Sequence, residues 1–178
     1  SFYGRMFMEY NVEPDKKMPL ILVILLFALG LCLALTPAFV KAVPSWCFQF
    51  PAMLVFLVCI LLLSRFVLTT YSYQLYDSAN TMSEYPKLNV YRIRKAGSNM
   101  VYCIPFNNIV SIKRVQKVEK MNMPQENLCA SMFPKSIYCL VYVVDTQEAV
   151  FLECDERFAQ QISKRIELWS EYRQQDPE

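Results

Sequence analysis

The sequence predicts a membrane hairpin of two helices followed by an α+β domain, in which antiparallel strands are closed by one C-terminal helix. Two observations support this fold class. Between residues 19 and 64 the only charged side chain is Lys41, and it separates two long apolar runs. After residue 70, apolar residues first alternate and then recur at spacings of three and four. The predicted organisation is a tail (1–18), a transmembrane hairpin (19–70), a folded domain (71–173) and a short tail (174–178).

The two apolar runs have the length and composition of membrane-spanning helices. They cover residues 19–40 and 50–68, and about 20 apolar residues are enough to cross about 30 Å of hydrocarbon. A secretory signal is the poorer reading of the first run, because this run is long, follows a polar stretch and is followed by a second span.

The positive charges near the spans predict their orientation. Arg5, Lys16 and Lys17 precede the first run and Arg65 lies at the end of the second, whereas the connection between them holds only Lys41. Because cytoplasmic flanks carry the excess of lysine and arginine, we expect a multi-pass protein of the cell membrane with both termini in the cytoplasm.

The composition argues against an active site. The chain has 178 residues, a formal charge of +2, no histidine, and seven cysteines without a CxxC spacing. It therefore lacks the commonest general base and metal ligand, and it carries no Gly-rich phosphate loop, HExxH or GxSxG motif. We expect a protein that is not an enzyme and holds no cofactor or metal. The nearly balanced charge gives no reason to expect nucleic acid as a partner.

The predicted domain consists of strands and then one helix. The expected strands are 71–76, 88–95, 100–105, 109–118, 136–144 and 149–153. Asp155 is the expected N-cap of the helix. An apolar stripe on this helix is expected to dock onto the sheet; it consists of Phe158, Ile162, Ile166, Trp169 and Tyr172.

Two segments resemble a known family. Residues 102–112 (YCIPFNNIVSI) are similar to a strand, Ile-Pro and spaced-isoleucine pattern, and residues 150–158 (VFLECDERF) are similar to a last strand that runs into a capped helix. Both patterns resemble the membrane-anchored bacterial proteins that carry a pleckstrin-homology-like domain. The resemblance implies an antiparallel sheet or partly open barrel with one C-terminal helix. The stretch 119–135 is longer than a compact version of this domain requires.

Basic residues on two predicted strands form a candidate lipid contact. A domain tethered beside the membrane lies where each cation near an anionic surface contributes about 1 kcal/mol. The alternative is a solvated strand face. The candidate residues are Arg92, Arg94, Lys113 and Lys117.

Two other groups of residues are candidate partner contacts. The first is a small-residue stripe on the first helix, which would pack either within the hairpin or against another subunit: Gly30, Ala34 and Ala38. The second lies in the long stretch 119–135, where methionines and an aromatic ring offer an adaptable surface: Met121, Met123, Leu128, Met132 and Phe133.

The sequence thus predicts a non-catalytic binding or assembly module anchored in the membrane, with membrane lipid and a protein partner or second copy as its contacts. Two alternatives stay open. One is an anionic-lipid-binding domain that uses the basic strands. The other is an accessory subunit of a larger transporter or channel, in which the small-residue stripe is the contact.

Overall fold

The chain forms two compact units, one of which interrupts the other in the sequence. The computed structural model describes residues 7–40, 43–76 and 86–175. The helical unit comprises Pro14–Thr69, and the sheet unit comprises Ser1–Glu13 together with Thr70–Glu178. The helical unit is therefore an insertion within the sheet unit. The sequence predicted two consecutive domains and did not foresee this arrangement.

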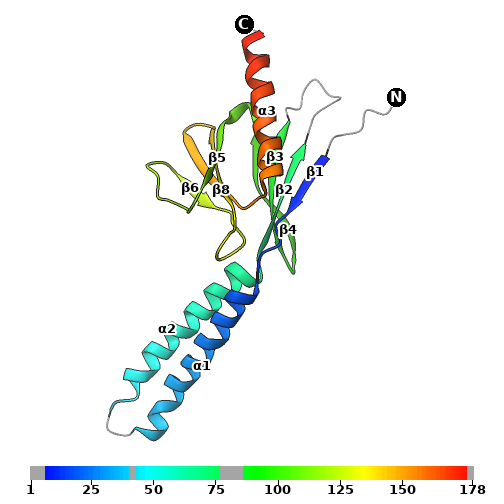
Figure 1. The fold of residues 1–178 in the computed structure, drawn as a ribbon. Coiled ribbons are helices and arrows are strands. Elements are labelled where there is room, and N and C mark those ends of the chain that lie inside the picture. Colours follow the sequence, from blue (N-terminus) through cyan, green and yellow to red (C-terminus); the bar gives the residue numbers. More distant parts are fainter. Residues whose placement is uncertain (1–6, 41–42, 77–85, 176–178) are drawn as a thin grey trace. The chain divides into compact units, whose positions relative to one another are not determined.

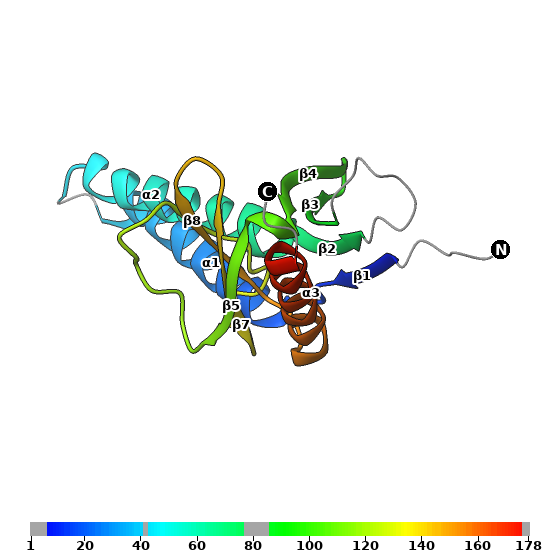
Figure 2. The same ribbon diagram turned by 90° about the horizontal axis from the view of Figure 1, so that it is seen from above.

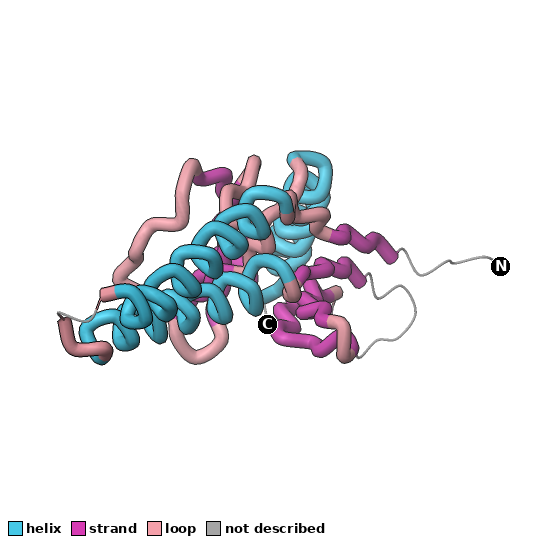
Figure 3. The backbone as a smooth tube through the Cα atoms, turned by 90° about the horizontal axis from the view of Figure 1, so that it is seen from below, coloured by secondary structure: helices cyan, strands magenta, loops and turns pink. Residues whose placement is uncertain are grey.

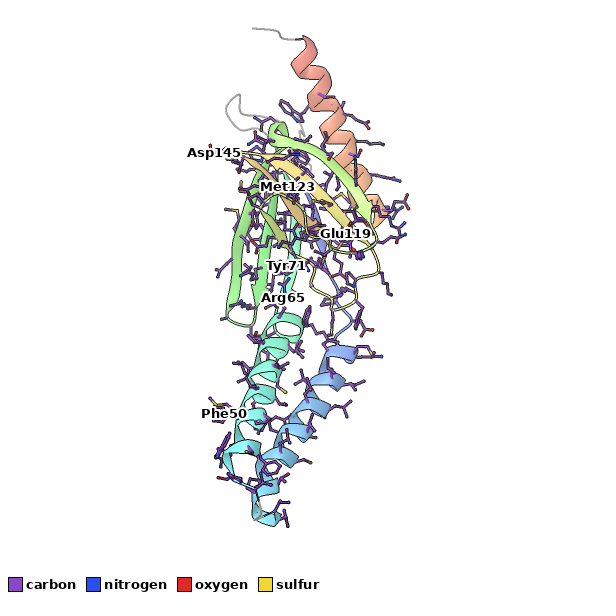
Figure 4. All side chains as sticks on the ribbon, turned by 90° about the vertical axis from the view of Figure 1, so that its left-hand side faces the viewer. Phe50, Arg65, Tyr71, Glu119, Met123 and Asp145 are labelled. Atoms are coloured by element: carbon purple, nitrogen blue, oxygen red, sulfur yellow. The ribbon has the colours of Figure 1, made fainter. Side chains whose placement is uncertain are left out.

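The helical unit consists of two helices that lie side by side (Figures 1 and 3). They are α1 (Lys17–Phe39) and α2 (Trp46–Leu62), and a π-helical turn, η1 (Leu63–Val67), continues α2. Both spans, of 23 and 22 residues, are long and apolar enough to cross a membrane. Large apolar side chains project from them; Phe50, for example, is 65% exposed (Figure 4). The predicted pair of apolar helices is confirmed, while Lys41 lies outside the described residues.

Gly30 lies at a close approach between the two helices. It is buried, and a Cβ atom built there would lie 3.0 Å from the ring of Phe56. Phe56 also packs edge-on against Phe27, with ring centroids 5.5 Å apart. Ala34 and Ala38 are exposed. The small-residue stripe therefore divides: Gly30 serves the hairpin, and the two alanines remain accessible.

The first sheet begins with a strand that the sequence analysis did not predict. Its order is β1 (Phe7–Asn11), β2 (Thr70–Tyr76), β3 (Lys87–Arg94) and β4 (Gly97–Pro105), all antiparallel (Figures 1 and 2). The region 1–18 was predicted as a tail because five residues are too few to show a period. The partner that makes β1 a strand, β2, follows only after both helices.

The second sheet contains a short parallel strand. Its order is β5 (Ile109–Val115), β7 (Ile137–Val143), β8 (Gln147–Leu152) and β6 (Gln125–Asn127), and β6 runs parallel to β8. A short 3₁₀ helix, η2 (Phe106–Asn108), joins β4 to β5. The other strands were predicted with small shifts at their ends. In contrast, β6 was not predicted, and β5 ends before Lys117.

The C-terminal helix α3 (Glu156–Gln175) closes a core to which both sheets contribute. Asp155 caps it as predicted, because its Oδ1 accepts a hydrogen bond from the backbone N–H of Phe158 at 2.8 Å. Phe158 and Ile162 are fully buried, while Trp169 packs against the same core and stays partly exposed. The helix continues into the predicted tail 174–178 as far as Gln175. The side chain of Tyr172 is outside those that the structure describes.

Candidate binding surfaces of the sheet unit

The long stretch 119–135 is anchored to the core and is not a free loop. Its strand β6 pairs with β8, and the backbone N–H of Leu128 donates to the carbonyl oxygen of Phe151 at 2.9 Å. The hydroxyl of Tyr73 donates to the carbonyl oxygen of Leu128 at 3.0 Å. The Leu128 side chain is 0% exposed. Burial in the core therefore removes Leu128 from the candidate partner contacts.

Glu153 holds the next part of this stretch. Its Oε2 accepts hydrogen bonds from the backbone N–H groups of Ala130 at 3.0 Å and of Ser131 at 2.8 Å. The backbone N–H of Glu153 donates to the hydroxyl oxygen of Tyr73 at 3.1 Å. Burial raises the pKa of Tyr73 well above its usual value, so this hydroxyl stays a neutral donor. A continuous set of hydrogen bonds thus joins β2, β8 and the stretch.

The remaining candidates in the stretch differ in exposure. Met121 and Met123 are half-buried against a second apolar cluster that contains Phe151. Met132 is also half-buried, whereas Phe133 is 71% exposed. Among the described large apolar side chains of this stretch, Phe133 offers the most surface to a partner. Met121 and Met123 instead pack against the apolar cluster and stabilise the fold.

A polar bridge of Arg92, Tyr102 and Glu126 joins the two sheets. The Tyr102 hydroxyl donates to Glu126 Oε2 at 2.5 Å, and Arg92 Nη2 lies 3.5 Å from Glu126 Oε1. The Arg92 guanidinium also lies 5.8 Å from the ring centroid of Tyr71, within the range of a cation–π contact. The bridge therefore connects β3 and β4 of one sheet to β6 of the other.

Burial and a carboxylate partner keep the bridging tyrosine protonated. Burial raises the pKa of Tyr102 to about 12, together with the hydrogen bond to Glu126, while Arg92 acts in the opposite direction. A similar pair lies on the second sheet, where the Tyr142 hydroxyl donates to Glu148 Oε2 at 2.6 Å. Burial and Glu148 raise the pKa of Tyr142 as well. Both hydroxyls act as hydrogen-bond donors at neutral pH.

The four predicted lipid-contact residues do not form one surface. Arg92 and Arg94 lie on β3, whereas Lys113 lies on β5 of the other sheet. Lys117 follows the end of β5 and is 3.6 Å from Glu119, with both side chains largely exposed, an arrangement that contributes little to stability. The two arginines line one cavity together. This basic groove of about 490 Å³ is lined by Arg92, Arg94, Ala96, Gly97, Asn99, Met100 and Val101.

A second groove lies beside α3. This α3 groove has a volume of about 550 Å³ and is formed by η2, the start of β5, the end of β7 and α3. Val110 and Val144 are 55% and 61% exposed in its lining, and Trp169 is half-buried there. Asn107 also lines it; its buried Oδ1 atom has no hydrogen-bond partner among the described residues. The sequence contained one sign of this groove. Val143 and Val144 are two consecutive apolar residues, which breaks the alternation at the end of the strand, and both are exposed.

Comparisons of the chain with protein families, with curated protein sequences and with solved structures found no match. Within the described residues, no three histidine, cysteine, aspartate or glutamate side chains gather in a way that could hold a metal ion. The two grooves and the apolar helices are therefore the features of the molecule that bear on its function.

The polar bridge predicts a pH-dependent contribution to stability. Tyr102→Phe should lower the free energy of unfolding by about 1 kcal/mol at neutral pH, because Glu126 loses its neutral donor. Since the folded-state pKa of Tyr102 is raised to about 12, the contribution is complete below the ordinary pKa near 10 and is lost as the pH rises towards 12. Urea unfolding of both proteins across this range measures the difference, and a difference that does not change with pH would contradict the assignment.

Proposed function

We propose that the protein is a non-catalytic module, anchored in the cell membrane, whose sheet unit binds a protein partner at the α3 groove. Its helices support membrane residence, since each spans about 30 Å with apolar side chains facing outwards. The charges flanking the helices favour cytoplasmic termini. The sheet unit contains the residues that come before and after the hairpin in the sequence. If both ends of the hairpin face the cytoplasm, the sheet unit is cytoplasmic.

The α3 groove is the observation that carries the proposal. Exposed apolar side chains gathered in a concave site are typical of binding surfaces. Asn107, Asn108 and Ser170 add polar groups to the lining of this groove. The partner would supply an apolar side chain between Val110 and Val144. It would also supply a hydrogen-bond donor to Asn107 Oδ1, because a buried acceptor without a donor is unfavourable.

The segments that resemble a pleckstrin-homology-like domain overlap the α3 groove. Its two segments, 102–112 and 150–158, form β4 with η2 and the start of β5, and β8 with the start of α3. Residues 106–110 belong to the first segment and line the α3 groove. We therefore propose a pleckstrin-homology-like domain that is used for assembly, with strand β1 added from before the membrane hairpin.

One observation favours anionic lipid as a second candidate ligand. Thr70, three positions after the end of η1, pairs with Ile93 near the end of β3. The basic groove therefore lies at the end of the first sheet where the chain arrives from α2. Cations near an anionic leaflet gain about 1 kcal/mol each. An accessory-subunit role would use the exposed Ala34 and Ala38 instead.

Charge substitutions in the α3 groove test the principal proposal. Val110→Asp with Val144→Asp should abolish a crosslinked complex recovered from native membranes, because each substitution puts a carboxylate into the partner's apolar contact. Leu168→Asp is the matched control, since it adds a carboxylate at an apolar position that is 54% exposed and does not line the groove. A complex that survives the two valine substitutions, in a protein that retains its thermal unfolding temperature, would contradict the assignment.

Single-cysteine variants test the proposed orientation. Cys47 lies at the start of α2 and is partly exposed, and Cys103 lies on β4 and is exposed. An impermeant maleimide should label Cys47 in intact cells and Cys103 only after permeabilisation. Cys129 and Cys139 are buried and would report poorly. Labelling of Cys103 but not of Cys47 in intact cells would show that the orientation is reversed.

A further inference from the structure

Strand β4 presents an open edge to solvent. It is the last strand of the first sheet, and within the described part of the chain only β3 pairs with it. Its sequence, GSNMVYCIP, contains no charged residue, and its first four residues are exposed. Natural edge strands usually carry charges, prolines or bulges that prevent pairing. In β4 the register with β3 shifts only after Met100. Its exposed first four residues, Gly97 to Met100, therefore pair regularly with β3 and keep the geometry of a regular strand.

Two arginines lie beside this open edge. Arg92 and Arg94 are two positions apart on β3 and therefore face the same side of the sheet, about 7 Å apart along the strand. They pair in register with Asn99 and Gly97 of β4. All four residues line the basic groove of about 490 Å³.

We propose that an acidic, extended segment of a partner protein pairs with the edge of β4 as a fifth strand of the first sheet. Two carboxylates at alternate positions of this segment, i and i+2, lie over Arg92 and Arg94. The backbone pairing provides affinity, and the two carboxylates provide specificity. The partner is thus a protein with an acidic-x-acidic sequence in a segment able to extend.

Strand pairing explains the groove better than a lipid headgroup does. An open strand edge offers both N–H donors and carbonyl acceptors, whereas a phosphate group can satisfy only the donors. Alternate side chains of an added strand also repeat every 7 Å or so, which is the spacing of the two arginines. The charge complementarity is therefore periodic and follows the strand.

Both arginines can receive a carboxylate. Arg94 is exposed and forms no ion pair among the described residues. Arg92 is held by Glu126 at 3.5 Å, which is longer than the 2.7–2.9 Å of a strong charge-assisted bond. Its buried Nε atom has no acceptor in the described structure. A second carboxylate that draws the guanidinium towards the groove would give this atom an acceptor.

The site at the edge of β4 is separate from the α3 groove and adds a second binding function. The two grooves have no lining residue in common. A failure at β4 would therefore leave the valine substitutions at the α3 groove as an independent test, and the reverse also holds.

Peptide binding to the full-length protein tests the inference. The protein is placed in nanodiscs of phosphatidylcholine, and the probes are the capped peptide Thr-Val-Glu-Val-Glu-Val-Thr and its analogue with both glutamates replaced by glutamine. We expect saturable binding of the acidic peptide, at least about tenfold tighter than that of the analogue, because two charge pairs are lost. Hydrogen exchange of residues 97–105 should become slower when the acidic peptide binds.

A charge reversal locates the site. Arg94→Glu should weaken binding of the acidic peptide by at least about tenfold and should favour a peptide in which one glutamate is replaced by lysine. Lys113→Glu makes the same change of charge on β5 and should leave binding unchanged. An equal effect of both substitutions would show non-specific attraction and would overturn the proposal.

Three other outcomes would also overturn it. The first is no saturable binding of the acidic peptide to the wild-type protein. The second is slower exchange of 97–105 in nanodiscs that contain phosphatidylserine but not with peptide, which would assign the groove to lipid. The third is a protection of β4 without peptide that increases with protein concentration, which would assign the edge to a second copy of this chain.

Discussion

The pairing of β1 with β2 is the interaction on which the rest of the sheet unit depends. Its register runs from Phe7 opposite Tyr76 to Asn11 opposite Ser72, and the backbone N–H of Val12 donates to the Tyr71 carbonyl oxygen at 3.0 Å. The two helices replace the loop of an ordinary β-hairpin. The sheet unit therefore becomes complete only after both helices have been synthesised.

This pairing also places the side chain of Tyr10 on β1 against the core. The ring of Tyr10 packs against the ring of Phe158 on α3, with centroids 5.2 Å apart, and is stacked on Tyr73 of β2 at 6.2 Å. Burial raises the pKa of Tyr10, as expected for a hydroxyl withdrawn from water. The first strand, the second strand and the last helix thus meet at Tyr10, so the two ends of the sequence stabilise each other.

The sequence predicted the elements whose signals are local. Two apolar runs of helical length, the alternation in β2 to β5, β7 and β8, and the cap at Asp155 all depend on neighbouring residues. In contrast, β1 and β6 are short and become strands only through distant partners. The grooves also depend on which strands become neighbours. For this reason Arg92 could be proposed as a ligand contact, but its bond to Glu126 could not be foreseen, and Leu128 was taken for a surface residue.

Hydrogen exchange on the full-length Tyr10→Ala protein tests most directly whether β1 completes one cooperative unit. Loss of this half-buried ring should lower the stability of the whole sheet unit by about 2 kcal/mol. The exchange free energies of the slowest amides in β7, β8 and α3 should then fall together, and those of the matched control Glu13→Ala should not change. A loss of protection confined to β1 and β2, with β7, β8 and α3 unchanged, would show that the N-terminal strand is an accessory and would contradict the account.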